Sequence, residues 1–361
     1  MKADACFSAT YGAARRGFAD ACVAAGAVVE SLPHTGTGPD GEALAIDVAW
    51  IGPPDAERVL VVCSGTHGVE GFCGSAGQIA WLAGGLHREI PSGVAWLAVH
   101  AVNPYGFAWL RRVNEDNVDL NRNFIDHDAG HPENPGYDAL AAALCPKSFD
   151  ADAQAETGKR LAAYEAEHGL EAWLNAVVKG QYRHADGLFY GGRTAAWSNR
   201  SLRALLRRRL RQARHVAYVD VHSGLGPSGY GEPMSCHPFG SPAHRRLRDW
   251  YGDAVTATGD GTMNFVDNDG DSSNAVLEAA PQAEVAAICL EFGTLPEWEV
   301  LTALRRENWL HFHGDRESRL GRNITAEIRE AFYQETAAWK DSIVERCIEI
   351  QRKAAAGLAG I

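Results

Sequence analysis

Short apolar runs that lead directly into polar residues constrain the fold of this chain more than any other feature of its sequence. The runs occupy residues 58–63, 94–102, 215–221 and 284–290. Short, continuously apolar runs are typical of strands that are buried on both faces. Longer amphipathic stretches separate them, which predicts an α/β domain. Because open α/β sheets bind ligands beyond their strand ends, the polar residues that follow each run are the candidate site.

Other segments complete this interpretation. Residues 44–51 predict a further strand, and helices are predicted for residues 7–26, 75–83, 199–214 and 322–355. Residues 135–178 have a helical pattern with mixed charge, so we expect a helical insertion there, as a pair of helices lying over the sheet. Residues 224–274 are rich in Gly, Ser, Asn and Asp, which favours loops around a pocket. Since no repeat or linker divides the sequence, we expect a single domain over residues 1–361.

Charge and composition exclude several classes of function. The chain has 46 acidic and 34 basic residues, a formal net charge of −12, which argues against non-specific binding to nucleic acid or anionic membranes. Residues 199–214 contain seven arginines, yet their leucines recur at helical spacing. An amphipathic helix with a solvated basic face explains this run more simply than a nucleic-acid site does. We therefore expect no nucleic-acid or membrane partner.

The cysteines and the first residues bear on the compartment. None of the eight cysteines forms a Cys-x-x-Cys pair, and they are spread along the chain, which favours reduced thiols. The first residues lack the apolar core of a signal peptide. The longest uncharged run, 90–110, contains His100 and Asn103 and is not a membrane span. A cytoplasmic location is the expectation.

Two segments that follow strands carry residues suited to a metal ion. His67 and Glu70 form a His-x-x-Glu pair after the run 58–63, and His222 follows the run 215–221. A catalytic zinc site uses three such protein ligands and leaves a fourth position for water. Ligand softness alone would also allow other borderline metals. Each histidine taken alone is better explained as a hydrogen-bonded loop residue than as a ligand.

The stretch 111–124 and the end of the last apolar run add further polar candidates. An arginine in this stretch can clamp a carboxylate while an asparagine beside it adds a donor, and a second arginine can face a developing oxyanion. The structural alternative is an ion pair between Asp119 and Arg122 that orders a loop. Glu291 follows an apolar strand, where burial would raise its pKa toward that of a general base; the alternative is a salt-bridged strand end. Asp220, two residues before His222, is a candidate hydrogen-bond partner for that ring.

Taken jointly, these residues resemble the zinc carboxypeptidases of the M14 type. The stretch 112–124, Arg-Val-Asn-Glu-Asp-Asn-Val-Asp-Leu-Asn-Arg-Asn-Phe, is similar to bacterial members of that group. The phrases Ser-Gly-Thr-His-Gly-Val-Glu-Gly-Phe and Gly-Leu-Phe-Tyr-Gly-Gly resemble its DUF2817 branch. The resemblance implies one three-layer α/β/α domain with a mixed central sheet, a zinc-carboxypeptidase-like fold with one Zn²⁺ per chain.

The resemblance also implies roles. His67, Glu70 and His222 would bind zinc, and Glu291 would act as general base and then acid. Arg112 would polarise the scissile carbonyl, while Asn121 and Arg122 would hold a substrate carboxylate. Since Arg111 and Arg112 are adjacent, choosing Arg112 depends on its register with Asn114. A tyrosine that contacts substrate has no clear counterpart, and the candidates are Tyr182, Tyr190 and Tyr230.

Other functions remain open at the level of sequence. An N-acyl amino acid amidohydrolase of the aspartoacylase or succinylglutamate desuccinylase type shares the metal motif, but it usually continues Asn-Arg with Phe-Pro-Gly, where this chain has Asn123-Phe124-Ile125. Either enzyme would act on a small peptide or N-acyl amino acid. The stretch 73–77, Cys-Gly-Ser-Ala-Gly, nearly matches a serine-hydrolase motif, with Ser75 as nucleophile. A non-catalytic zinc-binding module is the remaining alternative.

Overall fold

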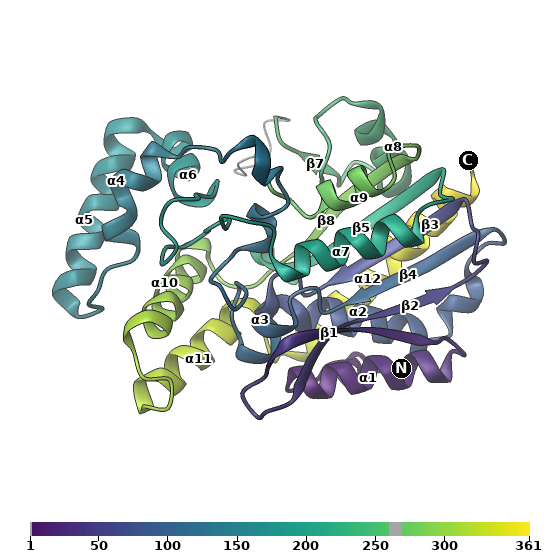
Figure 1. Cartoon of the computed structure of the whole chain (residues 1–361), viewed down its shortest axis with the longest axis horizontal. Coiled ribbons are helices and arrows are strands. Elements are labelled where there is room, and N and C mark those ends of the chain that lie inside the picture. The colour runs from purple at the N-terminus through teal and green to yellow at the C-terminus, as the bar shows by residue number, and fades with distance from the viewer. Residues whose placement is uncertain (1, 260–268) are drawn as a thin grey trace.

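A mixed sheet is the centre of the computed structural model, which describes residues 2–259 and 269–361 (Figure 1). In this part of the chain the sheet has eight strands in the order β1-β2-β4-β3-β5-β8-β6-β7. The strands are β1 (Val29–Thr37), β2 (Ala43–Ile51), β3 (Arg58–Ser64), β4 (Val94–His100), β5 (His215–Ser228), β6 (Gly231–Ser235), β7 (Thr256–Ala257) and β8 (Glu284–Gly293). The apolar runs expected to be buried strands are β3, β4, β5 and β8, which lie side by side.

Strand direction determines where the polar residues meet. β4, β3, β5 and β8 run parallel, whereas β1–β2, β2–β4 and β6–β8 are antiparallel. In the parallel register, Cys63 lies opposite Asp220, and His222 lies opposite Glu291. The segments that follow β3, β5 and β8 therefore leave the sheet at the same edge.

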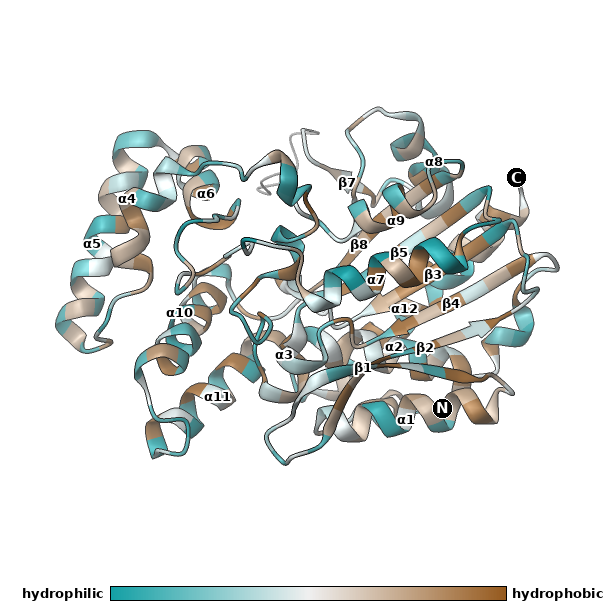
Figure 2. Cartoon of the chain, viewed as in Figure 1, coloured by the Kyte–Doolittle hydropathy of each residue, from teal (hydrophilic) through white to brown (hydrophobic). Residues whose placement is uncertain are grey.

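Helices cover both faces of the sheet, which confirms the expected layered α/β architecture. On one face lie α1 (Tyr11–Ala24), α2 (Gly71–Ala83), α8 (Pro242–Tyr251) and α12 (Ala337–Ala359). On the other lie α7 (Trp197–Arg209) and α9 (Ser273–Ala279). In α7 the leucines face the sheet, while Arg208 and Arg209 pair with Glu30 at the surface, as expected for an amphipathic helix with a basic outer face (Figure 2). The short helix α3 (Pro104–Trp109) follows β4.

The segment 135–178 differs from the expected pair of helices over the sheet. It is fully described and forms three helices, α4 (Pro135–Leu144), α5 (Ala151–His168) and α6 (Leu170–Val178). They pack at one end of the molecule with α10 (Glu297–His313) and α11 (Arg319–Phe332), around a separate apolar cluster (Figure 1). Arg305 of α10 is buried and donates to the carbonyl oxygens of Leu144 and Ala143, at 2.9 and 3.2 Å, which satisfies the end of α4.

Two further expectations need correction. The single helix expected over 322–355 is two helices, because α11 ends at Phe332 and Thr336 caps α12 by accepting a hydrogen bond from the backbone N–H of Trp339. The loops expected over 224–274 contain the end of β5, β6, α8, β7 and the start of α9, and residues 260–268 of that range lie outside the described residues. Among the described helices, none combines the length and the apolar character needed to cross a membrane.

Candidate metal centre

His67 stands on a tight turn that follows β3. The next residues form a 3-10 turn in which the backbone N–H groups of Gly68 and Val69 donate to the carbonyl oxygens of Arg112 and Arg111, at 3.1 and 2.9 Å. Position 68 has no room for a side chain, because a Cβ atom there would lie 2.0 Å from the backbone of α3. The local sequence thus holds the His-x-x-Glu turn against the stretch that carries the arginines.

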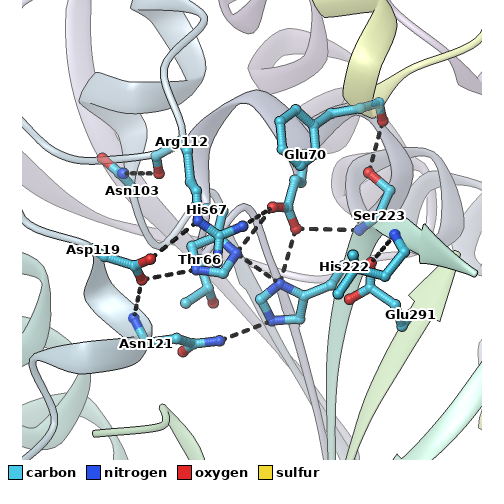
Figure 3. Close-up of polar contacts among 12 residues, drawn as sticks. Thr66, His67, Glu70, Asn103, Arg112, Asp119, Asn121, His222, Ser223 and Glu291 are labelled. Atoms are coloured by element: carbon cyan, nitrogen blue, oxygen red, sulfur yellow. Dashed lines mark hydrogen bonds and ion pairs between the residues drawn. The ribbon is translucent and has the colours of Figure 1, made fainter. Parts of the chain in front are cut away.

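Three candidate metal-binding side chains converge at the carboxyl ends of the parallel strands (Figure 3). His67 Nδ1 lies 3.0 Å from Glu70 Oε1, and His222 Nδ1 lies 2.9 Å from Glu70 Oε2. The two Nδ1 atoms are 3.1 Å apart. All three side chains are buried. The structure therefore brings together the three residues that the sequence singled out as metal ligands.

The opposite edge of each imidazole ring meets a buried carboxylate. His67 Nε2 lies 3.0 Å from Asp119 Oδ1, and His222 Nε2 lies 2.9 Å from Asp220 Oδ2. Because ionised carboxylates only accept hydrogen bonds, each ring in the neutral form that binds a metal carries its proton at Nε2. Two Nδ1 lone pairs and the Glu70 carboxylate then point at one another, which is unfavourable unless a cation lies between them. This donor set fits Zn²⁺, including the carboxylates that orient its histidines.

Asp220 has the place that the sequence suggested, but the role of Asp119 was missed. The expected alternative, an ion pair between Asp119 and Arg122, does not form in the described part of the chain; Asp119 instead pairs with Arg112, whose Nε lies 3.0 Å from Oδ2. Asp119 stands two residues before Asn121, within the stretch that resembles the carboxypeptidases. That position is the sequence signal that could have pointed to a role for Asp119 at the site.

The charges around the centre keep its carboxylates ionised. Burial opposes ionisation of Glu70, but in the absence of a bound cation the charged forms of His67 and His222 outweigh it and hold the pKa of Glu70 well below its usual range. Burial is likewise outweighed at Asp119, where Arg112 and His67 lower the pKa. At Asp220, His222 has the same effect on the pKa against burial. The site therefore presents fixed negative charge to a cation.

The adjacent arginines point in different directions. Arg112 reaches the centre, with Nη1 2.9 Å from Glu70 Oε1 and Nε bonded to Asp119. Arg111 turns away and forms a buried ion pair with Glu307 at 2.6 Å. The structure places the arginine that was chosen from its register with Asn114 next to the candidate ligands.

Glu291 lies on the other side of His222, at the end of β8. Its Oε1 accepts a hydrogen bond of 3.0 Å from the backbone N–H of Leu225. Burial, together with the nearby carboxylate of Glu70, raises the pKa of Glu291 to about 7. A carboxylate with this pKa can accept and return a proton near neutral pH.

Asn121 lies in the 3-10 turn Leu120–Arg122, beside the centre. Its Oδ1 accepts from the backbone N–H of Ser272 at 3.1 Å. Its Nδ2 lies 3.4 Å from His222 Nε2, but this is a contact between two N–H groups when Nε2 donates to Asp220. Ser272 also donates through Oγ to Asp220 at 2.7 Å. Asn121 therefore joins its own turn to the segment before α9 and lies beside the imidazole of His222.

Arg122 is buried and has an unusual set of partners. Nη1 donates to the carbonyl oxygen of Asn121 at 2.9 Å, and Nη2 donates to that of Val178, at the end of α6, at 2.6 Å. Its Nε is buried without a partner, and no carboxylate pairs with it among the described residues. Of the candidate tyrosines, Tyr182 donates its hydroxyl to the carbonyl oxygen of Arg122 at 2.5 Å, so this hydroxyl is already engaged.

Ser75, the alternative nucleophile, lies inside α2 and is 3% exposed. Its Oγ is 3.0 Å from Nε2 of the buried His100, whose ring stacks on Phe18. The nucleophilic serine of the motif that this stretch resembles has an exposed position on a sharp turn between a strand and a helix. Ser75 does not have one.

Comparison with known proteins gives one family model and several remote structural likenesses. A family model described as Protein of unknown function (DUF2817) matches residues 7–346. No curated protein sequence matches the chain. Carboxypeptidase A from Helicoverpa armigera has 13% identity and a TM-score of 0.41, over 89% of this chain and 73% of its own. Murein-tripeptide amidase MpaA from Escherichia coli O157 has 18% identity and a TM-score of 0.35, over 79% of this chain and 89% of its own. The ectoine utilization protein EutE (DoeB) from Ruegeria pomeroyi has 16% identity and a TM-score of 0.38, over 79% of this chain and 67% of its own.

Proposed function

This chain belongs to the DUF2817 family, and on that footing we propose that it is a zinc-dependent hydrolase that cleaves a peptide or amide bond next to a substrate carboxylate. One observation carries the proposal: Nδ1 of His67, Nδ1 of His222 and the carboxylate of Glu70 converge at 2.9–3.1 Å. Zinc bonds of 2.0–2.1 Å in a tetrahedral site would set ligand atoms about 3.3 Å apart. The donor atoms thus nearly match a zinc site.

Each remaining polar group has a chemical task in this proposal. When bound, zinc would supply Lewis acidity and a water molecule of lowered pKa. Glu291 would take a proton from the attacking water and return it to the leaving amine. Arg112, with Nε and Nη1 engaged by Asp119 and Glu70, would present Nη2 to the carbonyl oxygen on which negative charge develops.

Recognition of the substrate carboxylate would fall to Arg122. Its buried Nε has no partner, and buried donors without a partner are uncommon in folded proteins. Asn121 would help by bonding its own turn to the backbone of Ser272. This set of roles is that of an M14-type zinc carboxypeptidase.

The test begins with metal content. Protein purified without added metal should contain about one zinc ion per chain by elemental analysis, and the His67→Ala variant should lose it. Absence of metal from the wild type, together with failure to take up added zinc, would exclude the proposal.

The second stage tests the reaction. Zinc-loaded protein is screened against short peptides with a free C-terminus and against N-acyl amino acids, the substrates of the amidohydrolase alternative. Glu291→Gln should keep its zinc and lose turnover by about 10²–10⁴-fold, the usual scale for a general acid–base residue. Glu299→Gln, an exposed position on α10, is the matched control. Full turnover by the Glu291→Gln variant would contradict the mechanism.

A further inference from the structure

The segment 187–192 passes beside the site, and its Phe189 has an unusual backbone conformation. Phe189 has a φ of +53°, in the left-handed region that bulky residues rarely adopt. The side chain is 7% exposed. Strained conformations of this kind persist where the surrounding structure enforces them, and they concentrate at functional sites.

Hydrogen bonds on both sides of Phe189 enforce this conformation. The backbone N–H of Gln181 donates to the carbonyl oxygen of Phe189 at 3.1 Å. The backbone N–H of Asp119 donates to the carbonyl oxygen of Tyr190 at 2.8 Å. Asn117 Nδ2 donates to the carbonyl oxygen of Gly187 at 2.9 Å. Tyr190, the residue after the strained one, is thus bonded to Asp119, the residue that orients His67.

The ring of Phe189 lies against both arginines of the site. Its centroid is 5.7 Å from Cζ of Arg112 and 5.8 Å from Cζ of Arg122, both within the range of a cation–π contact. The two guanidinium groups are supported differently. Arg112 forms ion pairs with Glu70 and Asp119, whereas Arg122 has only backbone carbonyl partners in the described part of the chain.

A buried cation such as Arg122 needs stabilisation. A carboxylate, the usual counterion, would compete with the substrate carboxylate for this guanidinium. A carboxylate from the protein would occupy the donors that a substrate carboxylate needs. An aromatic face stabilises the positive charge without accepting its N–H groups, so the donors stay available. The burial that lowers the pKa of Arg122 is one measure of the need for such support.

We propose that Phe189 is a positioning residue whose ring takes the place of a counterion for Arg122 and keeps that guanidinium fixed and free for a substrate carboxylate. The ring also touches Arg112, so it sets the position of the carboxylate-binding group relative to the carbonyl-polarising group. The inference rests on the proposed roles of these two arginines. It assigns a purpose to the Gly-Leu-Phe-Tyr-Gly-Gly stretch, which neither binds metal nor supplies a proton.

The first experiment measures the order of the arginine side chains in the zinc-loaded chain. NMR follows the Nε–H signals of Arg122 and, as an internal control, of Arg111, which is bound to Glu307 away from Phe189. In Phe189→Leu, exchange of the Arg122 Nε–H with water should rise by about tenfold, the scale set by a desolvated cation–π contact, while Arg111 stays unchanged. Equal exchange of the Arg122 signal in variant and wild type would overturn the proposal.

A second variant separates electrostatics from shape and guards against misfolding. Replacing Phe189 by 3,4,5-trifluorophenylalanine keeps the ring but removes the negative charge of its face. The Arg122 signal should change in the same direction as in Phe189→Leu. The same replacement at Phe107, whose ring packs against Phe72 in the apolar core, is the matched control and should leave Arg122 unaffected. A fluorinated Phe189 with wild-type arginine order would overturn the proposal.

Binding of a simple anion distinguishes this inference from the proposed function. Phenylacetate is titrated into the wild type and both Phe189 variants, with neutral phenylacetamide as the charge control. The affinity for phenylacetate should fall by about tenfold in the variants, while zinc content stays constant. Unchanged affinity in the variants would contradict the role of Phe189. If the wild type itself does not bind phenylacetate, the proposed recognition of carboxylates by Arg122 is wrong. The NMR result alone then decides whether Phe189 orders the Arg122 side chain.

Discussion

Replacing Asp119 by asparagine removes one charge from the centre without changing the size of the side chain. Asp119 accepts hydrogen bonds of 3.0 Å from His67 Nε2, from Arg112 Nε and from the backbone N–H of Asn121. Asparagine offers a single oxygen, so its amide nitrogen must face either the imidazole or the guanidinium. If the oxygen faces Arg112, the His67 proton moves to Nδ1 and the lone pair needed for the metal is lost.

The expected cost follows from this geometry. Partners that orient a metal-binding histidine are worth about 10–100-fold in metal affinity. We therefore expect the zinc dissociation constant of Asp119→Asn to rise by about 10–100-fold, which corresponds to about 1.4–2.7 kcal/mol. Asp119→Asn also removes a charged hydrogen-bond acceptor from Arg112, which should lower the unfolding free energy of the chain.

The assay is competition for zinc between the apoprotein and a chromophoric chelator. Asp47→Asn is the matched control, because Asp47 is a buried carboxylate that pairs with Arg15 at 2.6 Å on another part of the sheet. It should lower stability and leave zinc affinity within about threefold, the context-dependent scatter expected of a distant site. Wild-type zinc affinity in a folded Asp119→Asn variant would refute the assignment of His67 as a ligand oriented by Asp119.

Two other predictions concern the stability of the fold. Removing zinc with a chelator should lower the melting temperature by several degrees, since a ligand at about a thousandfold its dissociation constant contributes about 4 kcal/mol, and the His67→Ala variant should show no such shift in calorimetry. His100 is buried, which lowers its pKa to about 4, below the value near 6.5 in the unfolded chain. Because the folded pKa is depressed, this stability is present above about pH 6.5 and is lost as the pH falls toward 4. The wild type should lose about 3 kcal/mol more unfolding free energy between pH 7 and 4 than His100→Gln does, and equal pH slopes in urea titrations would exclude this source.

The sequence predicts the centre of the sheet better than its edges, for a physical reason. Strands buried on both faces must be continuously apolar, so β3, β4, β5 and β8 are visible as runs. The edge strand β1 is partly exposed and contains Pro33 and Gly36, which are typical of loops. β6 was not predicted either, because Pro233 is also untypical of a strand. Elements that owe their strand conformation to their neighbours leave little local signal.

In the candidate site, too, the residues that follow buried strands were predictable from the sequence and the contacts between distant segments were not. His67, Glu70, His222 and Glu291 were found because they follow the visible strands, and the structure brings them together. The partner of Asp119 was not predictable, since the choice between Arg112 and Arg122 depends on how the turn after β3 packs against the arginine stretch. The break before α12 was missed because apolar spacing continues across it, and only the cap at Thr336 marks it.

The ligands of the metal centre are far apart in the sequence, and this separation has a kinetic consequence. His67 and His222 are separated by 155 residues and meet only when β3 and β5 have paired in register. The unfolded chain therefore offers zinc no such cluster, and capture of the ion must follow assembly of the sheet. Stabilisation gained after the folding barrier slows unfolding and leaves the folding rate nearly unchanged. Under the proposed zinc assignment, metal binding would therefore slow unfolding of the folded chain without accelerating its folding.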